Sequence, residues 1–66
     1  MSKKEVIPQG KSVANLAAAY DVSRGFIYSE LKRGNLKALK IGSRTIITAE
    51  QEAEWLASKE LYKPEE

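Results

Sequence analysis

Residues 12–34 read SVANLAAAYDVSRGFIYSELKRG, and this stretch decides the fold. Ser12 is a good N-cap residue, and the apolar side chains after it recur at intervals of three and four, which places them on one face of a helix. The alanines between them add helix propensity. The pattern predicts a first helix from about Val13 to Tyr20. Its apolar face consists of Val13, Leu16, Ala17 and Tyr20.

A second helix is predicted directly after a tight turn. Asp21 is among the few residue types that tolerate a left-handed backbone, and Ser23 is a second N-cap candidate. The helix is expected to cover Arg24 to Arg33, with Gly34 as the residue that ends it. Two short helices joined by so tight a turn are typical of a helix-turn-helix.

The second helix has an apolar stripe and a polar face. Ile27 and Leu31 lie four residues apart and form the stripe expected to be buried. Successive residues are rotated by about 100° around a helix, so the opposite face can be read from the sequence. That face holds Gly25, Ser29 and Lys32, with Tyr28 and Arg33 on its flanks.

After Gly34 the sequence period changes to about two, which predicts a β-hairpin in which Leu39 and Ile41 alternate with Lys40. A two-residue turn, Gly42-Ser43, would place Arg44 opposite Ile41 on the apolar face. A three-residue loop, Gly42-Ser43-Arg44, would instead pair Ile41 with Thr45 and Leu39 with Ile47, leaving Arg44 in solvent. Because burying an unpaired guanidinium is costly, the three-residue loop is predicted.

A last helix is predicted from the capping box formed by Thr48 and Gln51, and it is expected to run to about Leu61. Its predicted apolar stripe is narrow, and Trp55 is expected to flank that stripe and cover the root of the hairpin. The stripe consists of Ala49, Ala53 and Leu56. The predicted organisation is a flexible N-terminal arm (1–11), one domain (12–61) and a C-terminal tail (62–66).

The composition favours a non-enzymatic protein. Sixty-six residues form one small domain, with little room for a shielded catalytic cleft. The chain has no His and no Cys, so imidazole bases, thiolates and zinc sites are excluded, and we expect neither a metal nor a cofactor. No signal peptide or membrane span is predicted, and a cytoplasmic location is expected.

The net charge of +2 hides a strong asymmetry along the chain. Residues 24–44 carry a net charge of +5 with Glu30 as their only acid, whereas residues 45–66 carry −4. A basic middle third is the pattern expected of a surface that binds a polyanion such as nucleic acid.

The order of short segments between Ser12 and Leu56 resembles the excisionase-like branch of the MerR-type winged-helix superfamily. The resemblance covers about two-thirds of the chain, and it rests on the order and spacing of the segments rather than on any one of them. These segments are Val22-Ser23-Arg24, Ile27-Tyr28, Arg33-Gly34-Asn35-Leu36, Ala38-Leu39-Lys40-Ile41-Gly42 with Arg44, Ile47-Thr48 and Glu54-Trp55-Leu56.

The resemblance implies a mainly α fold with a small β-hairpin, a winged helix-turn-helix. It implies a protein that binds and bends double-stranded DNA, with the second helix in the major groove and the hairpin wing in an adjacent minor groove. Such excisionases, or recombination directionality factors, direct a phage or mobile-element integrase toward DNA excision, with further copies bound to adjacent sites. Two alternatives remain: a small MerR-like transcriptional regulator, and a protein-interaction adaptor that does not bind DNA.

The resemblance also implies which residues would contact DNA. Arg24 lies in the first turn of its helix, where a cation opposes the helix dipole, so a bound phosphate would compensate for it. Arg44 lies at a turn, where nothing structural requires arginine, and it suits the negative potential of a narrow minor groove. The predicted recognition-helix set is Arg24, Gly25, Tyr28, Ser29, Lys32 and Arg33, and the predicted wing set is Lys40, Ser43 and Arg44.

Two departures from the family pattern involve the last helix and Phe26. Glu52 and Ala53 stand where a large apolar residue is common, so the packing there is expected to be looser or shifted. Phe26 stands where a small polar residue is common. It could contact a thymine methyl group, contact a partner subunit, or fold back onto the domain.

Overall fold

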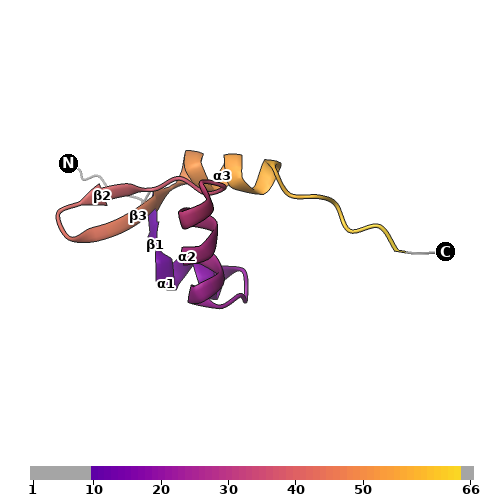
Figure 1. Ribbon diagram of the computed structural model, residues 1–66, viewed down its shortest axis with the longest axis horizontal. Helices are drawn as coiled ribbons and strands as arrows, with labels where there is room; N and C mark the ends of the chain where they lie inside the picture. Colours follow the sequence, from indigo (N-terminus) through magenta and orange to yellow (C-terminus); the bar gives the residue numbers. More distant parts are fainter. Residues whose placement is uncertain (1–9, 65–66) are drawn as a thin grey trace, which may run out of the picture.

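In the computed structural model, residues 10–64 are described, and they form three helices and one three-stranded antiparallel sheet (Figure 1). The fold is therefore mixed α/β rather than mainly α with a two-stranded hairpin. The sheet order is β1-β3-β2, so the last strand in sequence lies in the middle. The elements are β1 (Gly10–Ser12), α1 (Val13–Ala19), α2 (Arg24–Arg33), β2 (Leu39–Ile41), β3 (Arg44–Thr48) and α3 (Ala49–Ala57).

The first two helices begin at the predicted caps. The Ser12 hydroxyl accepts a hydrogen bond from the Asn15 amide at 3.1 Å, and the Ser23 hydroxyl accepts one from the Phe26 amide at 3.0 Å. Gly34 ends α2 in the left-handed conformation, with φ of 83°. These predictions are confirmed because each cap depends only on residues within one helical turn.

The prediction for the N-terminal arm was wrong at its end. Gly10 and Lys11, assigned to the arm, pair with Thr48 and Ile47 of β3 and so belong to the sheet. A strand of three residues is too short to show a period in the sequence. Residues 1–9 of the expected arm lie outside the described residues.

Gly10 is required by the close approach of β1 to β3. A Cβ atom at this position would lie 2.5 Å from Ile46 Cγ2 and 3.1 Å from the Ile47 carbonyl oxygen. Gly10→Ala is therefore expected to lower the free energy of unfolding by about 1–3 kcal/mol, as overpacking does elsewhere. Urea unfolding followed by circular dichroism measures the change.

Gly25→Ala provides the matched control, because the added methyl group is the same. At Gly25 the nearest atom to the new Cβ is Ser23 Oγ at 3.8 Å, an ordinary contact, and the residue lies in a helix. This variant is expected to stabilise the fold by about 0.5–1 kcal/mol. Equal unfolding midpoints for the two variants would contradict the close approach of β1.

The predicted register of the hairpin was wrong. Ile41 pairs with Arg44 and Leu39 pairs with Ile46, so the loop consists of two residues, Gly42 and Ser43. Gly42 has φ of 62°, which fits a glycine in the first position of a tight hairpin turn. The premise behind the prediction failed, because Ile41 is 57% exposed and the face that it shares with Arg44 is open to solvent. All three arginines of the chain lie within residues 10–64 and are exposed.

The core lies where the helices meet the sheet. Leu16, Ile27 and Ile47 are the largest fully buried side chains, and they come from α1, α2 and β3. The buried apolar cluster consists of Val13, Leu16, Ala17, Ile27, Leu36, Ile47 and Trp55. None of the helices within residues 10–64 is long and apolar enough to cross a lipid bilayer.

The predicted inner face and end of α3 were both wrong. Trp55 is buried, whereas Ala49, Ala53 and Leu56 are exposed. Burying one indole removes far more apolar surface from water than burying alanines, so tryptophan decides which face turns inward. The helix ends at Ala57 instead of near Leu61, and the Ser58 hydroxyl donates a hydrogen bond to the Trp55 carbonyl oxygen at 2.7 Å.

A buried carboxylate, Glu30, joins α2 to α3. Its side chain accepts hydrogen bonds from Trp55 Nε1 at 2.9 Å and from Asn35 Nδ2 at 3.2 Å, and it forms an ion pair with Lys59. The sequence identified Glu30 only as the single acid of the basic segment. These donors compensate the buried carboxylate for its lost contact with water. Because two of them, Trp55 and Lys59, lie in or just after α3, they hold α2, the candidate recognition helix, against α3.

A second carboxylate, Glu52, joins three elements. It forms an ion pair with Lys11 of β1 at 2.7 Å and accepts a hydrogen bond from the Tyr20 hydroxyl at the end of α1. The expectation of loose packing at this position is thus replaced by a polar link. The hydrogen bond from Lys11 and then that from Tyr20 lower the pKa of Glu52, and the contact with Glu52 raises the pKa of Tyr20.

These carboxylates predict that the fold loses stability in acid. The hydrogen bond from Lys59, followed by that from Trp55, lowers the pKa of Glu30 from its ordinary 4.5 to about 2. A carboxyl group with a depressed pKa in the folded state stabilises the fold above its unfolded pKa and loses that contribution as the pH falls. Stability is therefore expected to decline as the pH falls from about 4.5 toward 2.

Thermal unfolding followed by circular dichroism across this pH range tests the expectation. Glu30→Gln should be less stable than the wild type at neutral pH and should show a weaker dependence on pH. Glu54→Gln is the control, since Glu54 is exposed on α3. A Glu30→Gln curve parallel to that of the wild type would show that Glu30 does not cause the acid loss.

Candidate nucleic-acid interface

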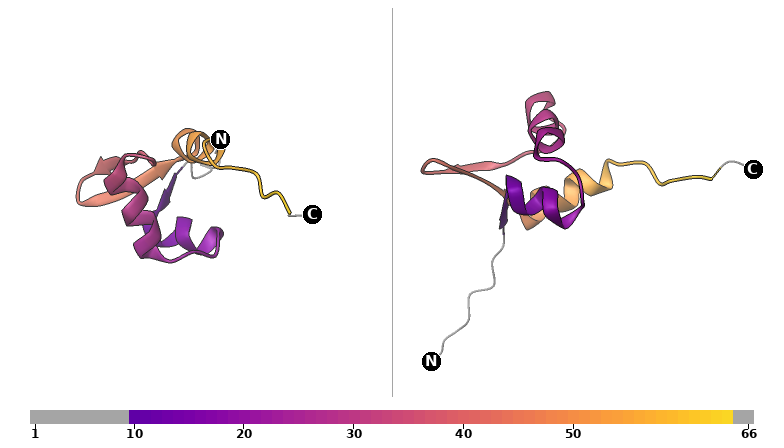
Figure 2. Two further views of the ribbon diagram at one scale, coloured as in Figure 1. Left: turned by 45° about the vertical axis from the view of Figure 1, so that its right-hand side comes forward. Right: turned by 90° about the horizontal axis from the view of Figure 1, so that it is seen from below.

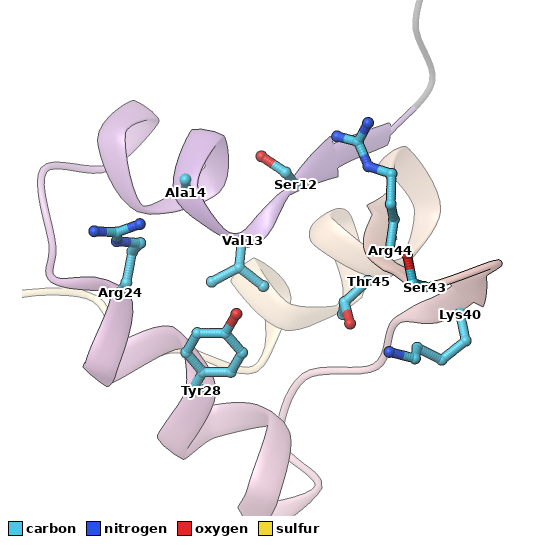
Figure 3. A pocket seen from close by; sticks show the side chains of 9 residues that line it. All are labelled: Ser12, Val13, Ala14, Arg24, Tyr28, Lys40, Ser43, Arg44 and Thr45. Carbon is cyan, nitrogen blue, oxygen red and sulfur yellow. The ribbon is translucent and has the colours of Figure 1, made fainter.

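An open groove of about 440 Å³ lies between α2, the start of α1 and the β2–β3 hairpin (Figure 3). Arg24 and Tyr28 project from one face of α2, four residues apart, and the side chains of the hairpin approach from the other side. Within the described residues, no acidic side chain lines the groove. The lining residues are Ser12, Val13, Ala14, Arg24, Tyr28, Lys40, Ser43, Arg44 and Thr45.

The groove unites five predicted site residues from two segments of the chain. Arg24 and Tyr28 were assigned to the recognition helix, whereas Lys40, Ser43 and Arg44 were assigned to the wing. Arg24, Tyr28, Lys40 and Arg44 are all exposed, so their polar groups are available to a ligand. The whole predicted wing set and two residues of the predicted recognition-helix set therefore form one surface.

The other four predicted residues lie outside the groove. Gly25, Lys32 and Arg33 are exposed on α2, and Ser29 is half-buried. Arg33 is separated from Arg24 by the length of the helix, about 13 Å at the usual rise per residue. A ligand that fills the groove would reach these residues only by extending along α2.

Four lining residues were not predicted: Ser12, Val13 and Ala14 at the start of α1, and Thr45 in β3. Thr45 is the cross-strand partner of Lys40, so the correct register would have placed it beside a predicted site residue. No sequence signal could have found the start of α1, because only the packing of α1 against α2 brings it to the groove.

The basic residues of this surface have no carboxylate partners within residues 10–64. The two ion pairs of the described region involve Lys11 and Lys59, which lie outside the basic segment 24–44. Glu30, the only acid of that segment, is buried and paired with Lys59. Among residues 10–64, no carboxylate therefore pairs with the positive charge of this segment.

Phe26 lies on another side of α2 from the groove. It is 42% exposed and does not line the groove, and Lys59 Nζ lies 5.8 Å from the centre of its ring. Lys59 also lies 5.4 Å from the centre of the Trp55 ring. Of the three roles left open by the sequence, this placement favours the one in which Phe26 folds back onto the domain.

The site can donate hydrogen bonds from two guanidinium groups, an ammonium group and hydroxyl groups into one groove. Such donors suit phosphate oxygens and the acceptor edges of bases. The function must be inferred from the geometry and charge of the groove, because no similar protein of known function was found. No protein family matches this chain, and no characterised protein or solved structure is significantly similar to it.

Proposed function

We propose that this chain is a small winged helix-turn-helix protein that binds double-stranded DNA. The observation that carries the proposal is the groove in which Arg24 and Tyr28 of α2 face Lys40, Ser43 and Arg44 of the hairpin. The lining formed by residues 10–64 contains basic side chains and no acidic ones, which supports an anionic ligand.

Dimensions and chemistry support this assignment. An α-helix with its side chains is about 10–12 Å across, so α2 fits a major groove about 12 Å wide. Arg24, near the N-terminus of α2, suits a guanine edge or a phosphate. Arg44, beside the two-residue turn, suits the negative potential of a narrow minor groove. In this arrangement α2 reads bases, and the hairpin holds the backbone and the adjacent minor groove.

We infer that the biological role is that of an excisionase, a DNA-bending protein that directs an integrase toward excision. The order of sequence segments supports this role, and so does the size of the contact surface. One short helix and one hairpin touch few base pairs, so useful occupancy requires several copies on neighbouring sites. Genome-wide footprinting separates the roles: clustered repeats beside an attachment site support excision, and promoter-centred sites support a transcriptional regulator.

Salt dependence of DNA binding tests the proposal directly. With about four to six phosphates neutralised, the logarithm of the association constant should fall with the logarithm of salt concentration with a slope of about −4 to −5. Fluorescence anisotropy of a labelled duplex, titrated at several salt concentrations, gives this slope. Failure to bind any duplex at low salt would contradict the proposal and support the protein-interaction adaptor.

A further inference from the structure

The connection between α2 and the hairpin, residues 34–38, joins the two walls of the groove. The helix and the hairpin leave this connection in different directions (Figures 1 and 2). Because the open groove separates them, their spacing is set at the connection and by their packing on the rest of the domain. A rotation at the connection would change the distance between Arg24 on one wall and Arg44 on the other.

The backbone of the connection is anchored on Glu30. The Glu30 carbonyl oxygen accepts hydrogen bonds from the Asn35 amide at 3.0 Å and from the Leu36 amide at 3.2 Å. The first of these bonds closes a Schellman turn around the left-handed Gly34, and Leu36 is buried in the core. The chain therefore leaves α2 in a defined direction.

The Glu30 carboxylate contacts two different parts of the fold with its two oxygen atoms. Oε1 accepts a hydrogen bond from Trp55 Nε1 at 2.9 Å and pairs with Lys59, both on the side of α3. Oε2 accepts a hydrogen bond from Asn35 Nδ2 at 3.2 Å, on the side of the connection. Glu30 is only 3% exposed, so each of these contacts replaces one that water would otherwise make.

We propose that Asn35 is a positioning residue, whose hydrogen bond to Glu30 sets the separation between α2 and the hairpin so that both walls of the groove can contact one ligand. Asn35 does not line the groove, so it acts through the geometry of the connection. The turn itself is closed by backbone groups and requires no amide side chain at this position. The role of Asn35 in the fold stands by itself, and its effect on DNA binding rests on the proposed function.

Pulsed electron paramagnetic resonance tests the separation without DNA. The chain has no Cys, so spin labels can be attached specifically to a Gly25→Cys/Ile41→Cys variant. Both positions are exposed outside the groove, on α2 and on the hairpin. The distances between the labels should be narrowly distributed when Asn35 is present and more broadly distributed in Asn35→Ala. Asn15→Ala, at an exposed asparagine of α1, is the matched control and should leave the distribution unchanged.

DNA binding provides a second measurement, made well below the unfolding midpoint of every variant. Loss of one hydrogen bond at the connection should weaken binding by about threefold to tenfold. In the Asn35→Ala background, Arg44→Ala should weaken binding by a factor at least about threefold smaller than in the wild type, because the displaced hairpin has already lost part of its contact. A contribution of Asn35 to stability alone would leave the effect of Arg44→Ala unchanged.

Asn35→Asp tests whether the hydrogen-bond donor matters. This variant keeps the shape of the side chain but places a second carboxylate beside Glu30, so the label distances should spread at least as widely as in Asn35→Ala. A wild-type distribution in either variant would overturn the proposal. A broad distribution with an unchanged effect of Arg44→Ala would overturn the role in binding. If the distribution broadens and no variant or wild type binds DNA, the proposed function fails while the role of Asn35 in the fold stands.

Discussion

Replacing Trp55 with alanine is expected to cause a large loss of stability. Trp55 is only 4% exposed and packs in the core, edge-on to Tyr20 with ring centres 5.8 Å apart. Deleting such a side chain costs about 3–5 kcal/mol in other small proteins. A domain of 66 residues has a total stability of about 3–10 kcal/mol, so this single change removes at least about a third of it.

The indole also provides a hydrogen bond that a second variant can isolate. Trp55→Phe keeps much of the apolar contact but removes the Nε1 donor, which lies 2.9 Å from Glu30. Its stability should therefore fall between those of Trp55→Ala and the wild type. Urea unfolding followed by the circular dichroism of the helices measures all three proteins.

Leu56→Ala is the control, because it truncates the neighbouring residue on the same helix. Leu56 is 41% exposed, and its loss should lower the free energy of unfolding by only about 1 kcal/mol or less. If Trp55→Ala and Leu56→Ala unfolded at the same urea concentration, the assignment of the inner face of α3 would be wrong.

Arg24→Ala and Arg44→Ala are each expected to weaken DNA binding by about tenfold to a hundredfold, because each removes a charged donor from the groove. The two residues lie on opposite walls of the groove, on α2 and on the hairpin, so their effects should be nearly additive in the double variant. Each variant that loses a phosphate contact should also show a salt slope less negative by about 1.

The pattern across DNA sequences separates the two arginines. If Arg24 contacts a base edge, its replacement should relax sequence preference, whereas replacing Arg44 should weaken binding to all duplexes alike. Fluorescence anisotropy with a panel of duplexes gives this comparison. Neither side chain forms an ion pair within residues 10–64, so both variants should retain the unfolding midpoint of the wild type.

Lys63→Ala is the matched control for charge. It removes one positive charge from an exposed residue of the C-terminal segment, outside the groove. The affinity for duplex DNA should fall by much less in Lys63→Ala than in Arg24→Ala or Arg44→Ala. If Lys63→Ala weakened binding as much as Arg44→Ala, the effect would come from the net charge of the protein and the groove would have no specific role.

The sequence by itself determined where the three helices begin and which residues cap them. Ser12, Ser23 and Thr48 each cap the helix that follows, and Gly34 ends α2, because each of these interactions is formed within about one helical turn. The Thr48 capping box with Gln51 is confirmed for the same reason. The basic segment and the three charged residues of the groove, Arg24, Lys40 and Arg44, were also evident, since charge is read directly from residue type.

The tertiary structure alone decided how these elements meet. The register of the hairpin depends on which of its faces is buried, and that face is chosen by contact with β1 and the core rather than by the hairpin itself. In the same way, Trp55 selects the inner face of α3 through Glu30, a residue 25 positions away. Long-range contacts of this kind leave no periodic signal in the sequence, because each one is a single pairing between distant segments.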